Sequence, residues 1–244
     1  MLSISVPCVN TSYDANRIIV LVRGNNSLSQ RGLFITVEGG EGVGKSTNMA
    51  YIENCLRDSG IDLQVTREPG GTALGEELRQ LLLQVREQSV SATTELLLIF
   101  AARAQHMEEL IEPALAAGRW VLCDRFTDAT YAYQSGGRGI DAATVRSLEK
   151  LVLGALRPDC TLLLDAPVDV GMARARGRGE LDRFEREEID FFERVRATYL
   201  RLAQDGEGRY RVIDASQPLE DVQQQIHKVC RDLLRCTAAG VVSE

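Results

Sequence analysis

The chain of 244 residues is long enough for one α/β domain with a sizeable core, which excludes a small protein held together by disulfides. Hydrophobic residues make up 44% and charged residues 26%, as in ordinary globular proteins, and no apolar run reaches the ~18 to 20 residues of a membrane helix. A net charge of −7 argues against a protein that coats nucleic acid or binds anionic membranes. Small anionic ligands remain possible because they need only local positive charge.

The 6 cysteines form no C-x-x-C pair and have no histidine at zinc-like spacing, so they are expected to be reduced thiols. Such cysteine usage fits a reducing compartment, and no segment has the pattern of a secretory signal. We therefore expect a cytoplasmic protein.

The N-terminal residues 1–30 differ from the rest, since they are polar, rich in Asn and Ser, and hold one short apolar run at 18–22. This composition predicts a poorly ordered arm, and residues 237–244 predict a frayed C-terminal tail. The folded domain is therefore expected over residues 31–236.

From residue 33 onward, short β-rich apolar runs alternate with longer segments of helical periodicity. The apolar runs are LFITVE (33–38), DLQVT (62–66), WVLCD (120–124), TLLLD (161–165) and YRVID (210–214). Helical spacing occurs at 46–56, 91–117, 142–156, 186–204 and 218–235. Buried strands separated by whole helices predict a three-layer α/β/α fold with a central parallel sheet.

A phosphate-binding loop follows the first predicted strand, because Gly39-Gly40-Glu41-Gly42-Val43-Gly44-Lys45-Ser46 matches G-x-x-x-x-G-K-[ST] and opens a predicted helix. Glycines let consecutive backbone N–H groups turn inward, which makes an anion site at a helix N-terminus. We expect Lys45 to reach the β- and γ-phosphates of a nucleoside triphosphate. Ser46 is expected to hold magnesium, which binds mostly through phosphate oxygens and water.

Such a loop by itself fits a kinase, a GTPase switch or a motor. The guanine-reading N-K-x-D sequence is absent, which weakens the switch hypothesis. Asp124 and Asp165 close two predicted strands, at the sheet edge where open α/β sheets bind their ligands.

Four further stretches are TREPGGT (66–72), FAARAQH (100–106), DRFTDATYAYQSGGRGID (124–141) and RARGRGELDRFE (174–185). With the phosphate loop, they closely resemble the bacterial thymidylate kinases in order and spacing, over about residues 33–235. The resemblance implies the P-loop nucleoside monophosphate kinase fold. It also implies transfer of the ATP γ-phosphoryl group to dTMP with magnesium, giving dTDP for dTTP synthesis, and a homodimer.

The resemblance implies that eight residues contact dTMP: Glu41, Arg79, Phe100, Arg103, Arg125, Thr130, Tyr133 and Gln134. Arg103 and Arg125 would hold the acceptor phosphate, a role that suits a planar guanidinium because it meets two oxygens at once. Arg79 and Gln134 would hydrogen-bond the pyrimidine, and Phe100 would stack on it.

The sugar is assigned by the same resemblance, with Glu41 at the 3′-OH and Tyr133 crowding the place of a ribose 2′-OH. Thr130 would lie beside the base.

Two positions depart from the family pattern. Ile99 occupies the usual place of the stacking aromatic, with Phe100 one position later. Ala129 replaces the serine of D-R-x-x-x-S, so a hydroxyl group near the phosphates is either missing or supplied by Thr127 or Thr130.

The expected ATP contacts are the phosphate loop and its lid: Gly39, Gly40, Glu41, Gly42, Val43, Gly44, Lys45, Ser46, Thr47, Arg174 and Arg178. Some relatives carry a catalytic arginine where this chain has Gly42. The resemblance implies that a lid near 172–184 supplies this charge, since Arg174, Arg176 and Arg178 alternate there with small residues.

The catalytic groups are expected to be Lys45, Asp124, Arg125, Arg178 and Glu41, with Asp124 and Glu38 as candidates to orient magnesium-bound water or Arg125. The acceptor phosphate is already ionised at neutral pH, so catalysis should rest on positioning and charge neutralisation. Two alternatives remain: a kinase for another nucleoside monophosphate, and a nucleotide-dependent switch protein without acceptor chemistry.

Overall fold

The structure is a computed structural model that describes residues 31–176, 183–184, 187–206 and 208–239. The predicted arm at 1–30, the end of the predicted tail at 240–244, and Arg178 of the predicted lid lie outside these residues. The compact unit that contains the described residues begins at Arg31.

The five strands β1 (Phe34–Glu38), β2 (Leu63–Arg67), β3 (Trp120–Asp124), β4 (Cys160–Asp165) and β5 (Tyr210–Asp214) form one sheet. Every pairing is parallel, in the order β2-β3-β1-β4-β5. The predicted parallel sheet is therefore confirmed, with β1 at its centre. All strands point the same way, so the segments that follow them meet at one edge of the sheet.

The helical elements are α1 (Lys45–Asp58), α2 (Ala73–Leu83), α3 (Ala92–His106), the π-helical segment η1 (Met107–Ile111), α4 (Glu112–Ala116), α5 (Thr127–Thr130), the π-helical segment η2 (Tyr131–Gly137), α6 (Ala142–Leu153), α7 (Val168–Arg176), α8 (Ile189–Asp205) and α9 (Leu219–Ala239). The predicted helix at 91–117 is continuous but not uniform, because α3, η1 and α4 follow one another directly. Pro113 lies at the start of α4 and has no N–H to donate, and the wider π turn precedes it.

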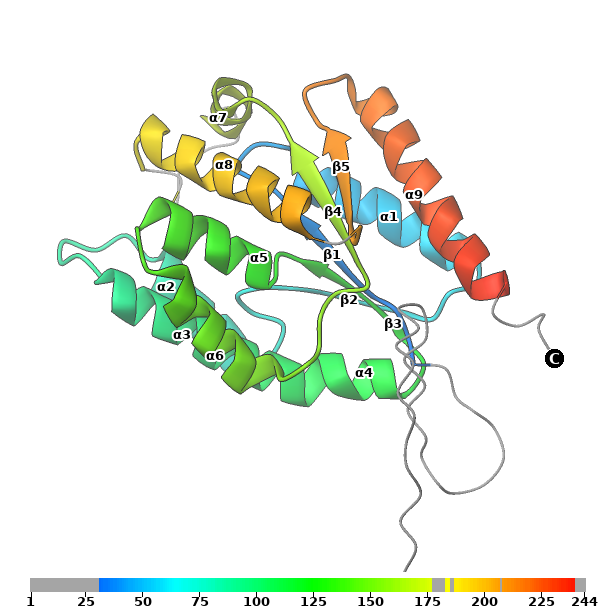
Figure 1. Cartoon of the computed structure of the whole chain (residues 1–244), viewed down its shortest axis with the longest axis horizontal. Coiled ribbons are helices and arrows are strands. Elements are labelled where there is room, and N and C mark those ends of the chain that lie inside the picture. Colours follow the sequence, from blue (N-terminus) through cyan, green and yellow to red (C-terminus); the bar gives the residue numbers. More distant parts are fainter. Residues whose placement is uncertain (1–30, 177–182, 185–186, 207, 240–244) are drawn as a thin grey trace, which may run out of the picture. The chain divides into compact units, whose positions relative to one another are not determined.

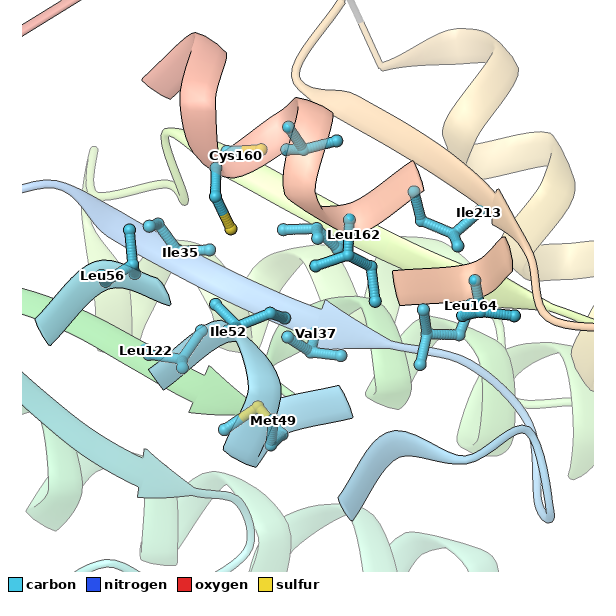
Figure 2. Packing of buried hydrophobic residues seen from close by; sticks show 14 of the residues in the cluster. Ile35, Val37, Met49, Ile52, Leu56, Leu122, Cys160, Leu162, Leu164 and Ile213 are labelled. Atoms are coloured by element: carbon cyan, nitrogen blue, oxygen red, sulfur yellow. The ribbon is translucent and has the colours of Figure 1, made fainter. Parts of the chain in front are cut away.

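Helices cover both faces of the sheet (Figure 1). On one face, α1 and α9 pack against the apolar side chains of β1 and β4. Figure 2 shows this core, with Met49, Ile52 and Leu56 of α1 lying over Ile35 and Val37 of β1. The opposite face is covered by η1, α4, α6 and α8, so the strands are buried on both sides and read as nearly continuous apolar runs.

Within the residues that the structure describes, no helix is both long enough and apolar enough to cross a membrane. The cysteines of this part of the chain are free thiols, as expected, at positions 55, 123, 160, 230 and 236.

Candidate active site

The phosphate loop leaves the end of β1 and enters α1, as the sequence motif predicts. Gly42 and Gly44 have φ angles of +69° and +86°, which side chains other than glycine rarely adopt. The Lys45 ammonium folds over this loop, since Nζ donates to the carbonyl oxygens of Gly39 at 3.0 Å and Gly40 at 2.6 Å. The loop is therefore a ready anion cradle whose lysine lies on it.

A second feature of the loop is its contact with α7. A Cβ atom on Gly42 would lie 1.8 Å from the carbonyl oxygen of Gly171, and one on Gly171 would lie 2.4 Å from that of Glu41. Two glycines thus let the phosphate loop and α7 touch backbone to backbone.

The loop borders a cavity of about 250 Å³ that opens at the carboxyl edge of the sheet. Its lining includes most of the predicted site residues: Glu41, Gly42, Val43, Gly44, Lys45, Ser46, Arg79, Arg103, Asp124, Arg125, Thr130, Tyr133 and Gln134. Residues from the phosphate loop, β2, β3, α1, α2, α3, α5 and η2 therefore meet here although they are far apart in the sequence. The sequence analysis did not predict Arg67, Glu68, Pro69, Leu83, Phe126 and Phe184, which also line the cavity.

Arg125 follows β3 directly and has a φ angle of +68°. Among the described residues other than glycine, it is the one with a positive φ angle. Its Nη2 donates to Oε1 of Glu41 at 2.6 Å, and the hydroxyl of Tyr133 donates to the same oxygen at 2.7 Å. The guanidinium carbon lies 4.8 Å from the centre of the Tyr133 ring. A backbone conformation that costs free energy is thus retained where it holds a guanidinium between the phosphate loop and η2.

Arg103 is almost fully buried on α3, with 2% of its surface exposed. Its Nε donates to Oε2 of Glu68 at 2.7 Å, and Nη2 donates to the carbonyl oxygen of Phe126 and to Oγ1 of Thr130. Nη1 is buried without a hydrogen-bond partner among the described residues. An unpaired buried guanidinium nitrogen on a cavity wall is suited to an anion that arrives with the ligand.

Glu68, which sequence reasoning missed, also accepts a hydrogen bond from Nδ1 of His106 at 3.1 Å. Nε2 of that histidine lies 2.7 Å from Oγ1 of Thr66. Glu68 and Thr66 both belong to the stretch TREPGGT, so the signal was present in the motif, but its partners lie on α3, far along the sequence.

Arg79 and Gln134, which are expected to hydrogen-bond the base, line the cavity from two different elements. Arg79 of α2 donates through Nη1 to the carbonyl oxygen of Pro69 at 3.0 Å. Gln134 of η2 donates through Nε2 to Oε1 of Glu95 at 2.9 Å.

Phe100, which the resemblance places against the base, does not lie on the cavity wall. Its ring lies in the core with Leu96 and Val145 and does not line the cavity, whereas Ile99 does. The Arg103 guanidinium carbon lies 4.8 Å from the centre of the Phe100 ring. Neighbouring residues of a helix face different directions. The Phe100 ring therefore packs against the Arg103 guanidinium, and Ile99 lines the cavity.

Of the two threonines that could replace the missing serine hydroxyl, Thr130 lines the cavity beside Ala129. Thr127 is buried and is absent from the lining.

Four predicted ATP contacts with described side chains or backbone do not line this cavity. Thr47 is exposed on α1, while Gly39 and Gly40 present carbonyl oxygens to Lys45. Arg174 donates to the carbonyl oxygens of Ala215 and Ser216, in the segment after β5. The side chain of Arg176 and the whole of Arg178 belong to the undescribed part of the chain.

Burial shifts the pKa values of Lys45 and Glu38, two groups next to the phosphate loop. It lowers the pKa of Lys45 to about 8, with the positive charge of Arg125 acting in the same direction. It raises the pKa of Glu38 to about 7, helped by the charge of Asp128. Glu38 accepts hydrogen bonds from the Phe126 N–H and the Tyr199 hydroxyl, so it anchors the backbone next to Arg125.

We expect kcat/KM for ATP to fall as pH rises through about 8, because a lowered pKa means that Lys45 loses its proton there and no longer attracts phosphate. The measurement is a pH profile of kcat/KM for ATP from about pH 6.5 to 10 at saturating dTMP. At the alkaline end, kcat/KM should fall about tenfold per pH unit. A flat profile up to pH 9.5 would contradict this assignment.

The comparisons with known proteins agree with this geometry. The family model described as thymidylate kinase matches residues 37–226. The chain belongs to the thymidylate kinase family. It is 58% identical to the thymidylate kinase of Teredinibacter turnerae over 203 residues, which are 83% of this chain and 99% of that protein. It is 59% identical to that of Pseudomonas putida over 195 residues, 80% of this chain and 93% of the relative.

A solved structure is similar as well, the crystal structure of thymidylate kinase from Ehrlichia chaffeensis. It has a TM-score of 0.66 and 32% sequence identity, covering 82% of this chain and 98% of that one. This thymidylate kinase family member is an ATP-dependent nucleoside monophosphate kinase that phosphorylates dTMP to dTDP in nucleotide synthesis. The comparisons do not favour another nucleoside monophosphate as acceptor.

Proposed function

We propose that the cavity holds dTMP with its phosphate facing the phosphate loop, so that the γ-phosphoryl of ATP transfers in line onto it. One observation carries this proposal: the buried Nη1 of Arg103 lacks a partner among the described residues and lies on the wall that Lys45 and Arg125 also line. Together with Arg67 and Arg79, these residues put five cationic side chains on one small cavity, which favours a ligand with several negative charges.

The positive charges divide between the two substrates. Lys45 and the loop N–H groups bind the β- and γ-phosphates of ATP, while Arg103 and Arg125 bind the acceptor phosphate. Holding two like-charged phosphates together is the main task of such a site, since positioning and charge neutralisation supply most of the catalysis. Arg178, and Arg174 if it leaves its carbonyl partners, would add charge from the lid, as the family resemblance implies.

At the sugar, Glu41 would accept the 3′-OH, and Tyr133 would crowd a 2′-OH. The hydrogen bond between the Tyr133 hydroxyl and Glu41 supports this, because it fixes the ring and the carboxylate together on the cavity wall. Arg79 and Gln134 would hydrogen-bond the base and Thr130 would lie beside it, with Ile99 as the apolar surface in place of Phe100.

Magnesium fits the donor set at the loop. Asp124 Oδ1 is a buried carboxylate oxygen without a hydrogen-bond partner among the described residues, and both Asp124 and Ser46 line the cavity. Ser46 would hold the ion through its hydroxyl and Asp124 would orient its bound water. When bound, magnesium neutralises charge on the β- and γ-phosphates.

The helices α2, α3 and α6 pack side by side and carry exposed apolar side chains, among them Leu81, Leu97 and Leu151. We propose that this face forms the homodimer. The cytoplasm remains the expected compartment, on the evidence of the free thiols.

The test is a coupled assay of ADP release with dTMP, dUMP, UMP, CMP and AMP as acceptors. We expect dTMP to give the highest kcat/KM and dUMP to follow by about 10- to 100-fold, since contact with one methyl group supports ~1 to 3 kcal/mol of selectivity. ADP release that is independent of the acceptor would overturn the proposal and favour a switch protein. A higher rate with UMP or CMP would overturn the assignment of the acceptor pocket.

A further inference from the structure

Glu95 is a fully buried carboxylate that the proposed chemistry does not use. It lies in the first turn of α3, has 0% of its surface exposed and does not itself line the cavity. A glutamate that merely complemented the helix dipole could remain exposed to water. A buried carboxylate is costly unless it is paired, so its partners indicate what it does.

Its partners are three side chains from two separate segments, η2 with its C-terminal cap and residues 183–184. Oε1 accepts from Nε2 of Gln134 at 2.9 Å and from Nε of Arg138 at 3.3 Å. Oε2 accepts from Nη2 of Arg183 at 2.5 Å. Arg183 is fixed in turn by the carbonyl oxygen of Leu82 at 2.8 Å. Two guanidinium groups thus pair with the Glu95 carboxylate, and its other hydrogen-bond partner among the described residues is the amide of a cavity residue.

An ionised carboxylate only accepts hydrogen bonds, whereas a glutamine amide has a donating nitrogen and an accepting oxygen. The carboxylate of Glu95 therefore dictates which end of the Gln134 amide faces it. The reverse orientation would bring the amide oxygen against a negatively charged oxygen. Because Nε2 faces Glu95, Oε1 lies on the other side of the amide and is the oxygen that Gln134 can present to the cavity it lines.

An acceptor atom on the wall selects among pyrimidine bases by their chemistry. Thymine and uracil carry an N–H group at ring position 3, which donates to such an oxygen. Cytosine carries a bare nitrogen there, so two acceptors would face each other without a proton between them. Polar pockets reject a ligand that leaves their buried groups unpaired far more strongly than apolar pockets reject a methyl group.

We propose that Glu95 is a positioning residue that fixes the Gln134 amide with its oxygen toward the base, and so makes the enzyme select bases with N3–H over cytosine. This inference rests on the proposed contact between Gln134 and the base. It adds a specificity-determining residue outside the cavity wall.

The test is Glu95→Gln, which keeps the shape of the side chain but removes the charge, so that the two facing amides can adopt either orientation. We expect the ratio of kcat/KM for dTMP to kcat/KM for dCMP to fall at least about tenfold, through a higher KM for dTMP and a gain with dCMP. We expect kcat with dTMP and KM for ATP to stay within about threefold of the parent, which a general loss of structure would not allow.

Glu149→Gln is the matched control. Glu149 is also a buried glutamate with an arginine partner, Arg157, and a hydroxyl donor, Tyr131, but it lies outside the cavity lining. We expect this variant to keep the parent ratio, and a fall equal to that of Glu95→Gln would overturn the inference.

The variant Gln134→Leu tests the proposed base contact separately from the proposed role of Glu95. If this variant lowers the ratio while Glu95→Gln keeps the parent value, the base contact stands and the role of Glu95 is overturned. If Gln134→Leu changes neither the ratio nor the KM for dTMP, the proposed base contact itself fails. Should Glu95→Gln not fold, Glu95→Asp withdraws the carboxylate from Gln134 by one methylene. A lower ratio in Glu95→Asp supports the inference, and an unchanged ratio overturns it.

Discussion

Replacing Arg125 with alanine is expected to lower kcat about 10³-fold with dTMP and ATP, the low end of the range for an arginine that acts on a transferring phosphoryl group. The guanidinium lies between Glu41 of the phosphate loop and the ring of Tyr133, where the two phosphates would meet. Alanine keeps a Cβ atom at φ +68°, so the backbone cost of this position hardly changes and the effect reports the side chain. Steady-state kinetics with both substrates saturating measure it.

Two variants control this result. Arg125→Lys keeps the charge but loses the planar fork, and we expect an intermediate fall of about 10- to 100-fold. Arg57→Ala removes an exposed arginine that pairs with Glu53 on α1, and kcat should not change. A kcat for Arg125→Ala within about threefold of the parent would remove Arg125 from the catalytic groups.

Replacing Arg103 with alanine should instead raise the KM for dTMP about 10²-fold and lower kcat much less. The buried Nη1 has no partner among the described residues, so we expect its hydrogen bond to be made to the acceptor phosphate in both the ground and transition states. A charge-assisted hydrogen bond at a buried site is typically worth ~2 to 5 kcal/mol on truncation. Titration with dTMP and initial rates together separate KM from kcat.

Within the part of the chain that the structure describes, the same substitution leaves buried Glu68 with His106 as its remaining ion partner, so stability should fall as well, by ~3 to 5 kcal/mol. Arg209→Ala is the matched control, because Arg209 pairs with the buried Asp128 but lies outside the cavity lining. Thermal melting should show a loss in both variants, whereas only Arg103→Ala should change the KM for dTMP. If both variants shift that KM equally, Arg103 is a structural residue.

Sequence alone sufficed for the sheet, because a parallel strand buried on both faces is a short apolar run and whole helices separate such runs. It did not reveal α2 or η2, for local reasons. The helix α2 has only 11 residues, and its N-cap is Thr72, whose side chain accepts a hydrogen bond from the Gly75 N–H. The segment η2 contains Gly136 and Gly137, which weaken a helical pattern although Gly137 fits against the ring of Phe191.

The sequence likewise pointed to some residues of the candidate site and missed others. Motif residues such as Lys45 and Arg125 line one cavity because the strand ends bring them to one edge of the sheet. Partners that act across the fold, such as Glu68 and Glu95, carry no local signature, since what matters is which buried cation or amide each faces. Ile99 lines the cavity and Phe100 does not, because a shift by one residue on a helix turns the side chain to another surface, which motif matching alone does not reveal.

The backbone contact between Gly42 and Gly171 explains why an arginine is absent from the phosphate loop. The space that a side chain at position 42 would enter is already filled by the peptide of α7, with the carbonyl oxygen of Gly171 at 1.8 Å from the ideal Cβ. Close packing of α7 against the loop therefore excludes any side chain at position 42 of this chain. The positive charge that some relatives place at this position would instead come from the lid, as the family resemblance implies.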